Sequence, residues 1–282
     1  VHVPNLKSLG SNVTVRAVVS GSGGSARQAA EKLGASVVAT DLSAVLQSED
    51  VEAVLIATRH NLHAEQCIAA VRAGKHVFVE KPLALTGDEC RAIIAEVEQA
   101  GVLCAVGFNR RFSPLALALR ETLDSTSGPK QIVYRVNAGP LPKTHWLLDP
   151  DVGGGRLLGE ACHFFDLMTW AANSKPVSVI GQAIGDSADD VSVVVKFAEG
   201  SVGTLIYTGL GNPALPKERI EVLAGGGVAV MDDFRSLTLY GLHGKSRKLR
   251  VQDKGHRALL EHFVNSVRGQ ETLTITAEDG LL

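Results

Sequence analysis

Residues 53–85 read AVLIATRHNLHAEQCIAAVRAGKHVFVEKPLAL and contain two short apolar runs separated by a helical pattern. The runs are residues 51–57 and 76–79, and the stretch between them, near 62–73, repeats its apolar residues at helical spacing. Strands that are apolar at nearly every position are buried on both faces, and strands joined through a helix run parallel. This stretch therefore predicts a strand–helix–strand unit of a parallel sheet.

The same alternation extends over the first 107 residues. Further strands are expected at residues 13–19, 36–39 and 102–106, with helices near 2–9, 25–33, 42–48 and 86–100. Because crossover connections between parallel strands are right-handed, the pattern predicts a doubly wound sheet with helices on both faces.

From about residue 130 the pattern changes to alternating polar and apolar residues, which predicts a mainly antiparallel sheet with one face exposed or covered by a partner. Its expected strands are 131–136, 177–184, 190–197, 201–208, 218–224, 228–231 and 237–240. Helices near 112–123, 157–172 and 256–268 are assigned to this half. The predicted fold class is α/β, with a doubly wound parallel-sheet domain at 1–108 and a second α/β domain with a mainly antiparallel sheet at 109–282.

The length, the charge balance and the cysteine spacing of the chain limit the kinds of partner and cellular location that we expect. The 282 residues suffice for two domains, and 28 basic against 30 acidic side chains give a net charge of −2. This balance gives no reason to expect a nucleic acid or a membrane as partner, and no apolar run is long enough to cross a bilayer. The cysteines at 67, 90, 104 and 162 lack C-x-x-C spacing, so we expect reduced thiols in a cytoplasmic protein without a metal.

A glycine-rich turn follows the strand expected at 13–19. In SGSGGSARQAAEKLG (20–34), Gly21, Gly23 and Ala26 fit G-x-G-x-x-G/A, the dinucleotide-binding fingerprint. The helix expected at 2–9 precedes this strand, however, which makes it the second strand rather than the first. Asp41, at the start of the following helix, is then expected to be a helix cap.

The end of a second strand faces the adenosine ribose of a bound dinucleotide, where an acidic residue accepts from the 2′-hydroxyl. This chain has Ser20 there, with Arg27 nearby, which favours NADP over NAD. The alternative is a turn without cofactor contact.

Polar residues also follow two other strands. Lys81, in Glu80-Lys81-Pro82, comes directly after strand 76–79, at the sheet edge where ligands bind in open parallel sheets. A lysine there could exchange a proton with a substrate hydroxyl during hydride transfer, or could be a solvated strand end. Thr58 can hydrogen-bond a ligand, and His63 begins a helix. His60 and His63, three residues apart, could suggest a metal, but no third ligand lies at useful spacing.

Residues 153–166 contain a third group of polar residues. Glu160, His163 and Asp166 are spaced by three and would form one polar ridge on an otherwise apolar helix. A buried histidine between two carboxylates could be a general acid or base, or a hydrogen-bonded core residue.

Two segments supply candidate substrate contacts. Arg110 and Arg111 follow strand 102–106 and could bind a carboxylate or phosphate, or could equally hold two domains together. His145 and Trp146 lie in a loop and could form a substrate wall, or could be ordinary loop packing.

Together these segments resemble the glucose–fructose oxidoreductase, inositol dehydrogenase and rhizopine-catabolism (Gfo/Idh/MocA) family. The residues that carry the resemblance are AVLIATRHNLHAEQCIAAVRAGKHVFVEKPLAL, VGFNRRFSP and GGGRLLGEACHFFDL, in this order over nearly the whole chain. The resemblance implies that residues 1–108 form a dinucleotide-binding Rossmann domain and that residues 109–282 form a substrate and oligomerisation domain. It implies NAD or NADP as cofactor, oxidation or reduction at a sugar or cyclitol carbon, and a homo-oligomer formed through the open sheet. It also implies a first strand and glycine loop before the helix at 2–9, which we expect this chain to lack.

The resemblance assigns roles residue by residue. Catalytic roles fall on Lys81 and His163. With the resemblance, cofactor contacts are assigned to Ser20, Thr58, Arg59, His63, Glu80 and Asn109, with Arg59 in place of the usual proline. Substrate contacts are assigned to Arg110, Arg111, His145 and Trp146.

One family position departs in this chain. The family's D-x-x-x-H pair falls on Gly159 and His163, so its aspartate is absent. Either His163 acts with Lys81 alone, or Glu160 or Asp166 substitutes, or activity has been lost. The expected function is an NAD(P)-dependent dehydrogenase or reductase; the alternatives are a redox-assisted glycosidase and a non-catalytic sensor of the same fold.

Overall fold

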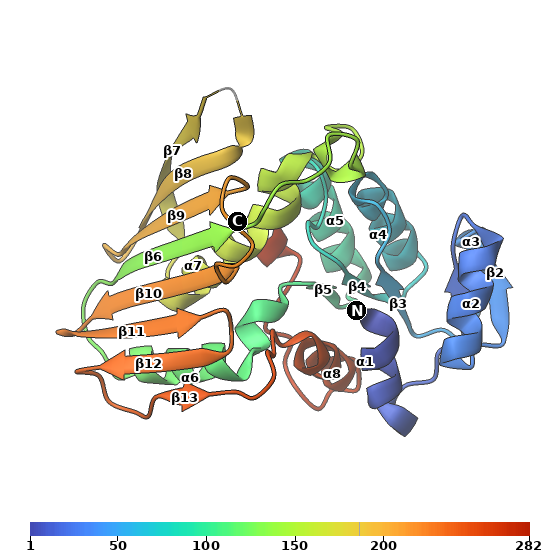
Figure 1. Cartoon of the computed structure of the whole chain (residues 1–282). Coiled ribbons are helices and arrows are strands. Elements are labelled where there is room, and N and C mark those ends of the chain that lie inside the picture. Colours follow the sequence, from blue (N-terminus) through green and yellow to red (C-terminus); the bar gives the residue numbers. More distant parts are fainter. Residues whose placement is uncertain (186) are drawn as a thin grey trace. The chain divides into compact units, whose positions relative to one another are not determined.

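The computed structural model describes residues 1–185 and 187–282. The chain divides into two compact units, one formed by residues 1–107 with 256–281 and the other by residues 108–255 with residue 282. Figure 1 shows parallel strands with their helices in the first unit and a large sheet in the second. The predicted α/β class, with Rossmann-type parallel strands and a large, mainly antiparallel sheet, is confirmed.

The first unit alternates strands and helices as the sequence pattern predicts. Its strands are β1 (Ala17–Val19), β2 (Val37–Ala39), β3 (Ala53–Ile56), β4 (His76–Val79) and β5 (Cys104–Val106). Its helices are α1 (His2–Ser8), α2 (Gly23–Leu33), α3 (Ser43–Leu46), α4 (His63–Arg72), α5 (Gly87–Ala100) and α8 (His256–Val267). The ends of α5 show why helices begin and stop here: Thr86 and Glu89 form a reciprocal capping box, and Gly101 ends the helix in the left-handed conformation.

The parallel strands of this unit form two sheets rather than one. β1 pairs with β2, and β3, β4 and β5 pair in that order. Within the described part of the chain, no strand joins β1 to β3. In a doubly wound sheet the second strand is separated from the fourth by the first. The separation of β1 from β3 therefore supports our interpretation of β1 as a second strand.

Helix α8 corrects the sequence-based assignment, which placed residues 256–268 in the second half. The structure groups α8 with the first unit. The ring of Phe263 meets that of Phe78 on β4 edge to face, with centroids 5.7 Å apart, and Arg268 donates to the Asn12 carbonyl at 2.6 Å. The apolar face of α8 is therefore buried against the parallel strands, a long-range contact that helical periodicity alone does not specify.

The second unit is built on one large sheet. Its strands are β6 (Gln131–Asn137), β7 (Pro176–Ile184), β8 (Ser187–Phe197), β9 (Val202–Thr208), β10 (Glu218–Ala224), β11 (Gly227–Asp232), β12 (Ser236–Tyr240) and β13 (Arg247–Lys248). They lie in the order β13-β12-β11-β10-β6-β9-β8-β7, antiparallel except for the parallel pair β6 and β9. The short β13, which the sequence analysis did not predict, extends the sheet through its pairing with β12.

Helices α6 (Pro114–Asp124) and α7 (Cys162–Ala172) cover one face of this sheet (Figure 1). Inward-facing Tyr134 and Tyr207 pack with Phe164 of α7 in a fully buried core. The opposite face is open, because outward-facing Val194, Ile206 and Leu223 are each about two-fifths exposed (40%, 39% and 42%).

No helix in the described ranges, 1–185 and 187–282, has the length and apolar character that crossing a membrane requires.

Replacing Phe263 by Ala tests the assignment of α8 to the first unit. Removing this buried ring should cost about 3–5 kcal/mol of unfolding free energy. Amide hydrogen exchange should then speed up in residues 53–107 and not in β6, β9 or β10. Glu261→Ala, on the exposed face of the same helix, is the matched control and should change neither. Faster exchange confined to the large sheet would contradict the assignment.

Candidate functional site

The ends of β3 and β4 are joined by a buried histidine. His63 Nδ1 lies 2.7 Å from the Pro82 carbonyl, and Nε2 lies 3.3 Å from the Thr58 carbonyl. Burial lowers the pKa of His63, so the ring is neutral near pH 7. Its single N–H best fits donation to Pro82, the shorter contact. His63 therefore anchors the segment after β4 through Pro82, while its second ring nitrogen lies next to the Thr58 carbonyl at the end of β3. The Thr58 hydroxyl donates to Gln66 Oε1 at 2.8 Å.

Glu80 is the next residue of this group. Its Oε1 accepts from His2 Nε2 at 2.8 Å, and its Oε2 accepts from the backbone N–H of Lys81 at 3.2 Å. Burial raises the pKa of Glu80, but the hydrogen bond from His2 and the charges of His2 and Lys81 outweigh it and lower the pKa. A Cβ on Gly107 would come within 2.8 Å of Glu80 Oε2, so the side chain is confined between β4 and β5. Glu80 is thus a held carboxylate at the carboxyl ends of the strands.

Lys81 is the second residue after β4 and is half-buried. Its bond to Pro82 is a cis peptide. His63 and Glu80 both hydrogen-bond to the backbone of residues 81–82, and these bonds fix the backbone position of the lysine. Arg59 is exposed one residue after Thr58, and the rings of His60 and His63 lie 5.6 Å apart. No cluster of three metal-binding side chains occurs among the described residues.

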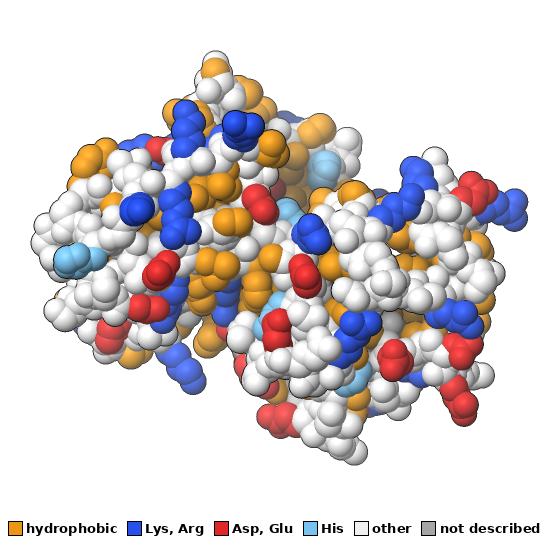
Figure 2. Space-filling view, turned by 90° about the horizontal axis from the view of Figure 1, so that it is seen from below, with side chains coloured by type: hydrophobic (Ala, Val, Ile, Leu, Met, Phe, Trp, Pro, Cys, Tyr) orange, Lys and Arg blue, Asp and Glu red, His pale blue; other side chains and the backbone are white. Residues whose placement is uncertain are grey.

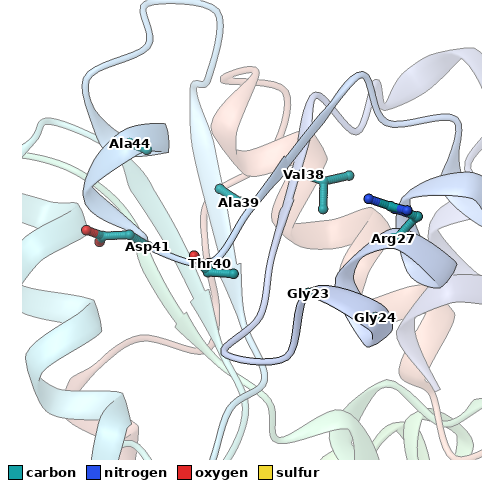
Figure 3. Close-up of a pocket in the computed structure, with 8 residues that line it drawn as sticks. All are labelled: Gly23, Gly24, Arg27, Val38, Ala39, Thr40, Asp41 and Ala44. Atoms are coloured by element: carbon teal, nitrogen blue, oxygen red, sulfur yellow. The ribbon is translucent and has the colours of Figure 1, made fainter.

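A pocket of about 640 Å³ lies beside the ends of β1 and β2 (Figure 3). Its lining residues are Gly23, Gly24, Arg27, Val38, Ala39, Thr40, Asp41 and Ala44. Ser20 precedes the pocket in the turn after β1, and its hydroxyl pairs with that of Ser25 at 2.8 Å. An open glycine turn with an arginine at the carboxyl end of a parallel strand suits part of a dinucleotide.

The second unit contains a buried carboxylate with four donors. Glu218, on an inward position of β10, accepts both Nε and Nη2 of Arg110 at 2.8 Å, the Tyr134 hydroxyl at 2.6 Å and Lys254 Nζ at 2.7 Å. Burial raises the pKa of Glu218, but the charges and hydrogen bonds of Arg110 and Lys254 outweigh it and hold the pKa far below its ordinary value. The guanidinium of Arg110 is thus fully engaged by its own unit.

Arg111 is engaged in the same way. Its Nε donates to Asp166 Oδ2 at 2.9 Å, and its Nη2 bonds to the second oxygen of that carboxylate. Both side chains are buried. Asn109 lies before this pair, and its amide nitrogen donates to the Lys254 carbonyl at 2.6 Å. Of the two sequence-based alternatives for Arg110 and Arg111, the structure therefore supports a structural role, although each arginine joins elements within one unit.

Of the predicted ridge, His163 and Asp166 lie on α7, and Glu160 lies in the turn that precedes it. Residues Leu157–Ala161 make a π-helical turn before α7, which shifts Glu160 relative to the α-helix that follows. Glu160 Oε2 accepts from Arg156 at 3.0 Å and from the Tyr207 hydroxyl, while Lys217 Nζ lies 3.5 Å from Oε1. Burial raises the pKa of Glu160, but Lys217, Tyr207 and Arg156 together lower it. The two carboxylates of the expected ridge thus bind different arginines.

His163 lies on the first turn of α7, nearly buried, with its ring 6.0 Å from that of Phe108 in an edge-to-face arrangement. His145 and Trp146 are stacked with centroids 5.8 Å apart in the loop after β6 and are both half-buried. A Cβ on Gly153 would meet Leu147 backbone at 2.4 Å, so this loop folds closely back on itself.

The structure thus brings Thr58, His63, Glu80 and Lys81 together at one sheet edge of the first unit. In the second unit it joins Asn109 and Arg110 to one network, and Arg111 to Asp166. Sequence reasoning missed Glu218, Tyr134 and Lys254. The sequence did contain a sign of this network: Glu218 occupies an inward position of the expected strand, and a buried charged residue requires buried partners.

Comparisons with known proteins agree with this architecture. A model of the oxidoreductase family with an NAD-binding Rossmann fold matches residues 1–108, and a model of the GFO/IDH/MocA C-terminal domain matches residues 130–230. The chain has the two parts of an oxidoreductase that uses a nicotinamide dinucleotide. It belongs to the Gfo/Idh/MocA family, as its motifs predict.

Individual relatives are distant in sequence but nearly full-length. Myo-inositol 2-dehydrogenase of Thermotoga maritima is 28% identical over 99% of this chain and 88% of that protein. The 1,5-anhydro-D-fructose reductase of Ensifer adhaerens is 27% identical over 98% of this chain and 86% of that protein. A crystal structure of an oxidoreductase domain protein from Kribbella flavida superposes with a TM-score of 0.87 at 24% identity, covering 99% of this chain and 89% of that one.

Replacing Glu218 by Ala tests the buried network. Because the change leaves Arg110 and Lys254 charged without their partner, it should lower the unfolding free energy by about 3–5 kcal/mol in urea titrations. The matched control is Glu221→Ala on the same strand, where the side chain is 36% exposed and the loss should stay below about 1 kcal/mol.

Acidification supplies a second readout of the same network. Because the pKa of Glu218 is lowered by folding, the carboxylate takes up its proton at a higher pH in the unfolded chain than in the folded one. The contribution of Glu218 to the unfolding free energy is therefore fully present above about pH 4.3, the ordinary pKa of a glutamate, and is lost as the pH falls below that value. Wild-type stability should fall more steeply with acid than that of Glu218→Gln. Equal slopes would contradict the ionised state of Glu218.

Proposed function

We propose that this protein oxidises or reduces a secondary alcohol carbon of a sugar, sugar derivative or cyclitol with a nicotinamide dinucleotide. The observation that carries the proposal is the Glu80-Lys81-Pro82 segment at the carboxyl ends of β3 and β4, whose backbone is fixed by hydrogen bonds. The chain that contains this segment belongs to an oxidoreductase family. The relatives that act on myo-inositol and on 1,5-anhydro-D-fructose support a polyhydroxylated substrate.

The cofactor, when bound, supplies the group that exchanges a hydride with the substrate carbon. We assign its contacts to Ser20, Thr58, Arg59, Glu80 and Asn109, with His63 acting through the Pro82 carbonyl to which it donates. The ends of β3 and β4 lie where doubly wound folds hold their ligands.

Lys81 and His163 handle the proton of the reacting hydroxyl in this proposal. An alcohol must lose its proton as the hydride leaves the carbon, so an amine or imidazole at the oxygen lowers the barrier. Glu160 and Asp166 are engaged by Arg156 and Arg111, which favours His163 acting with Lys81 over a substitute carboxylate. His145 and Trp146, whose stacked rings stay half-exposed, are the proposed substrate contacts of the second unit.

The proposed partners are a small polyol and further copies of this chain. Figure 2 shows lysine and arginine side chains interspersed with aspartate and glutamate on the face in view, which agrees with the net charge of −2 and not with a nucleic-acid partner. Cys67, Cys90 and Cys104 are buried thiols, which supports a reducing, cytoplasmic location.

Lys81→Ala and His163→Ala should each lower kcat/KM at least a hundredfold with a responsive polyol, because general acid–base groups contribute about 10²–10⁴-fold. Nicotinamide absorbance at 340 nm follows the turnover of a polyol panel. Lys7→Ala and His243→Ala, which remove exposed side chains of the same types, are the controls and should keep wild-type rates.

Several results would count against this function. Normal turnover by both variants would refute the assigned roles. Cleavage of an aryl glycoside without net change in nicotinamide absorbance would favour the redox-assisted glycosidase. Dinucleotide binding with no turnover of any polyol by the wild-type protein would favour a sensor.

The open face of the large sheet is our proposed oligomer interface. Ile206→Lys would place a charge on that face and should shift the protein toward monomer in sedimentation velocity, since burying an unpaired charge opposes association. Val251→Lys, at an exposed valine away from the sheet strands, is the control and should leave the assembly unchanged. A wild-type monomer at all concentrations would contradict the proposal.

A further inference from the structure

The turn after β1 carries no carboxylate. It consists of Ser20, Gly21 and Ser22, and α2 begins at Gly23 without an acidic residue in its first turn. In doubly wound folds an Asp or Glu at this place accepts from the free 2′-hydroxyl of NAD, whereas a nearby arginine accommodates the 2′-phosphate of NADP. The absence of the carboxylate removes the group that would repel a phosphate.

An arginine lies at the same place. Arg27, on the second turn of α2, lines the pocket beside the end of β2 and extends its guanidinium toward Val38 (Figure 3). Its side chain is exposed, and no carboxylate of the described residues makes an ion pair with it. A planar guanidinium with open donors matches a phosphate dianion in geometry and in charge.

The acidic residue of this pocket is already engaged. Asp41 Oδ1 accepts from the backbone N–H of Ser43 at 2.9 Å, and this hydrogen bond lowers the pKa of Asp41. In Figure 3 its carboxylate points away from Arg27. Asp41 thus bonds the backbone just before α3, whose N-cap position is Leu42, and it does not neutralise Arg27.

The turn also leaves room for a phosphate. A Cβ added to Gly21 or Gly23 would meet no atom within 4 Å. The Ser20 hydroxyl lies beside this open turn, 2.8 Å from the Ser25 hydroxyl, which itself donates to the Ser22 carbonyl at 2.9 Å. The single proton of Ser20 can therefore turn toward a phosphate oxygen. An arginine, one hydroxyl donor and open space thus occur together where β1 leads into α2.

We propose that Arg27 reads a phosphate on the adenosine ribose, so that the protein prefers NADP and NADPH over NAD and NADH. This inference rests on the proposed function, because it assumes that a nicotinamide dinucleotide binds. It goes beyond that function in naming the form of the cofactor and the residue that selects it.

Fluorescence titration of the full chain with NADPH and with NADH tests the preference without turnover. The wild-type protein should bind NADPH roughly tenfold to a hundredfold more tightly, the range expected for hydrogen bonds to a charged group. Arg27→Gln should remove most of this ratio and leave the dissociation constant for NADH within about twofold. Lys32→Gln, which removes the same charge from the last turn of α2, is the matched control and should keep the wild-type ratio.

A gain-of-function variant completes the test. Gly21→Asp places a carboxylate in the open turn, so it should weaken NADPH binding and strengthen NADH binding. Equal wild-type affinities, or an Arg27→Gln variant that loses both cofactors alike, would overturn the inference. Polyol oxidation with NADH preferred would overturn it while leaving the proposed function intact. If neither dinucleotide binds, both proposals fail.

Discussion

The buried carboxylate of Glu218 is the constraint on which the second unit depends. An ionised carboxylate without water requires partners on every side, and Arg110, Tyr134 and Lys254 supply them from the turn after β5, from β6 and from the segment before α8. These elements are far apart in the sequence. One side chain on β10 therefore connects the first and last segments of the second unit to its central strands. The paired ion bridge of Arg111 and Asp166 does the same for α7.

This use of the arginines changes the interpretation of the motif that contains them. Two adjacent cations after a parallel strand resemble a site for an anionic substrate, yet both are buried and matched by carboxylates of their own unit. A polyol, which carries no charge, does not need a free arginine. The polar groups at the ends of β3 and β4 in the first unit, and the stacked His145 and Trp146 in the second, are the ones that keep some exposure. The chemistry proposed for this family member is therefore assigned to the strand-end group that includes Glu80 and Lys81, and not to the two buried arginines.

Periodicity predicted most of the fold, because nearly every strand and helix is marked by its apolar spacing. It placed β4 at residues 76–79 and β10 at 218–224 without error. It predicted α8 as a helix but assigned it to the wrong unit, because its partner Phe78 lies almost two hundred positions away. It missed β13, which has no apolar alternation. For the site, residue type at strand ends identified Lys81 and its neighbours. The π-helical turn at 157–161 was not predictable from spacing by three, since a single extra residue in a helical turn redirects Glu160 toward Tyr207.

Strand β7 has a consequence for the protein in concentrated solution. It forms one end of the large sheet, both of its faces are exposed along residues 177–184, and within the described part of the chain no strand pairs with its outer edge. Val179 and Ile180 are among its most exposed side chains. A long apolar edge strand is a template for the addition of a strand from another molecule. Strand β7 contains no lysine and no proline after its first residue, the two residue types that would block such pairing. Intermolecular strand addition at this edge is thus an inherent aggregation hazard of the sheet.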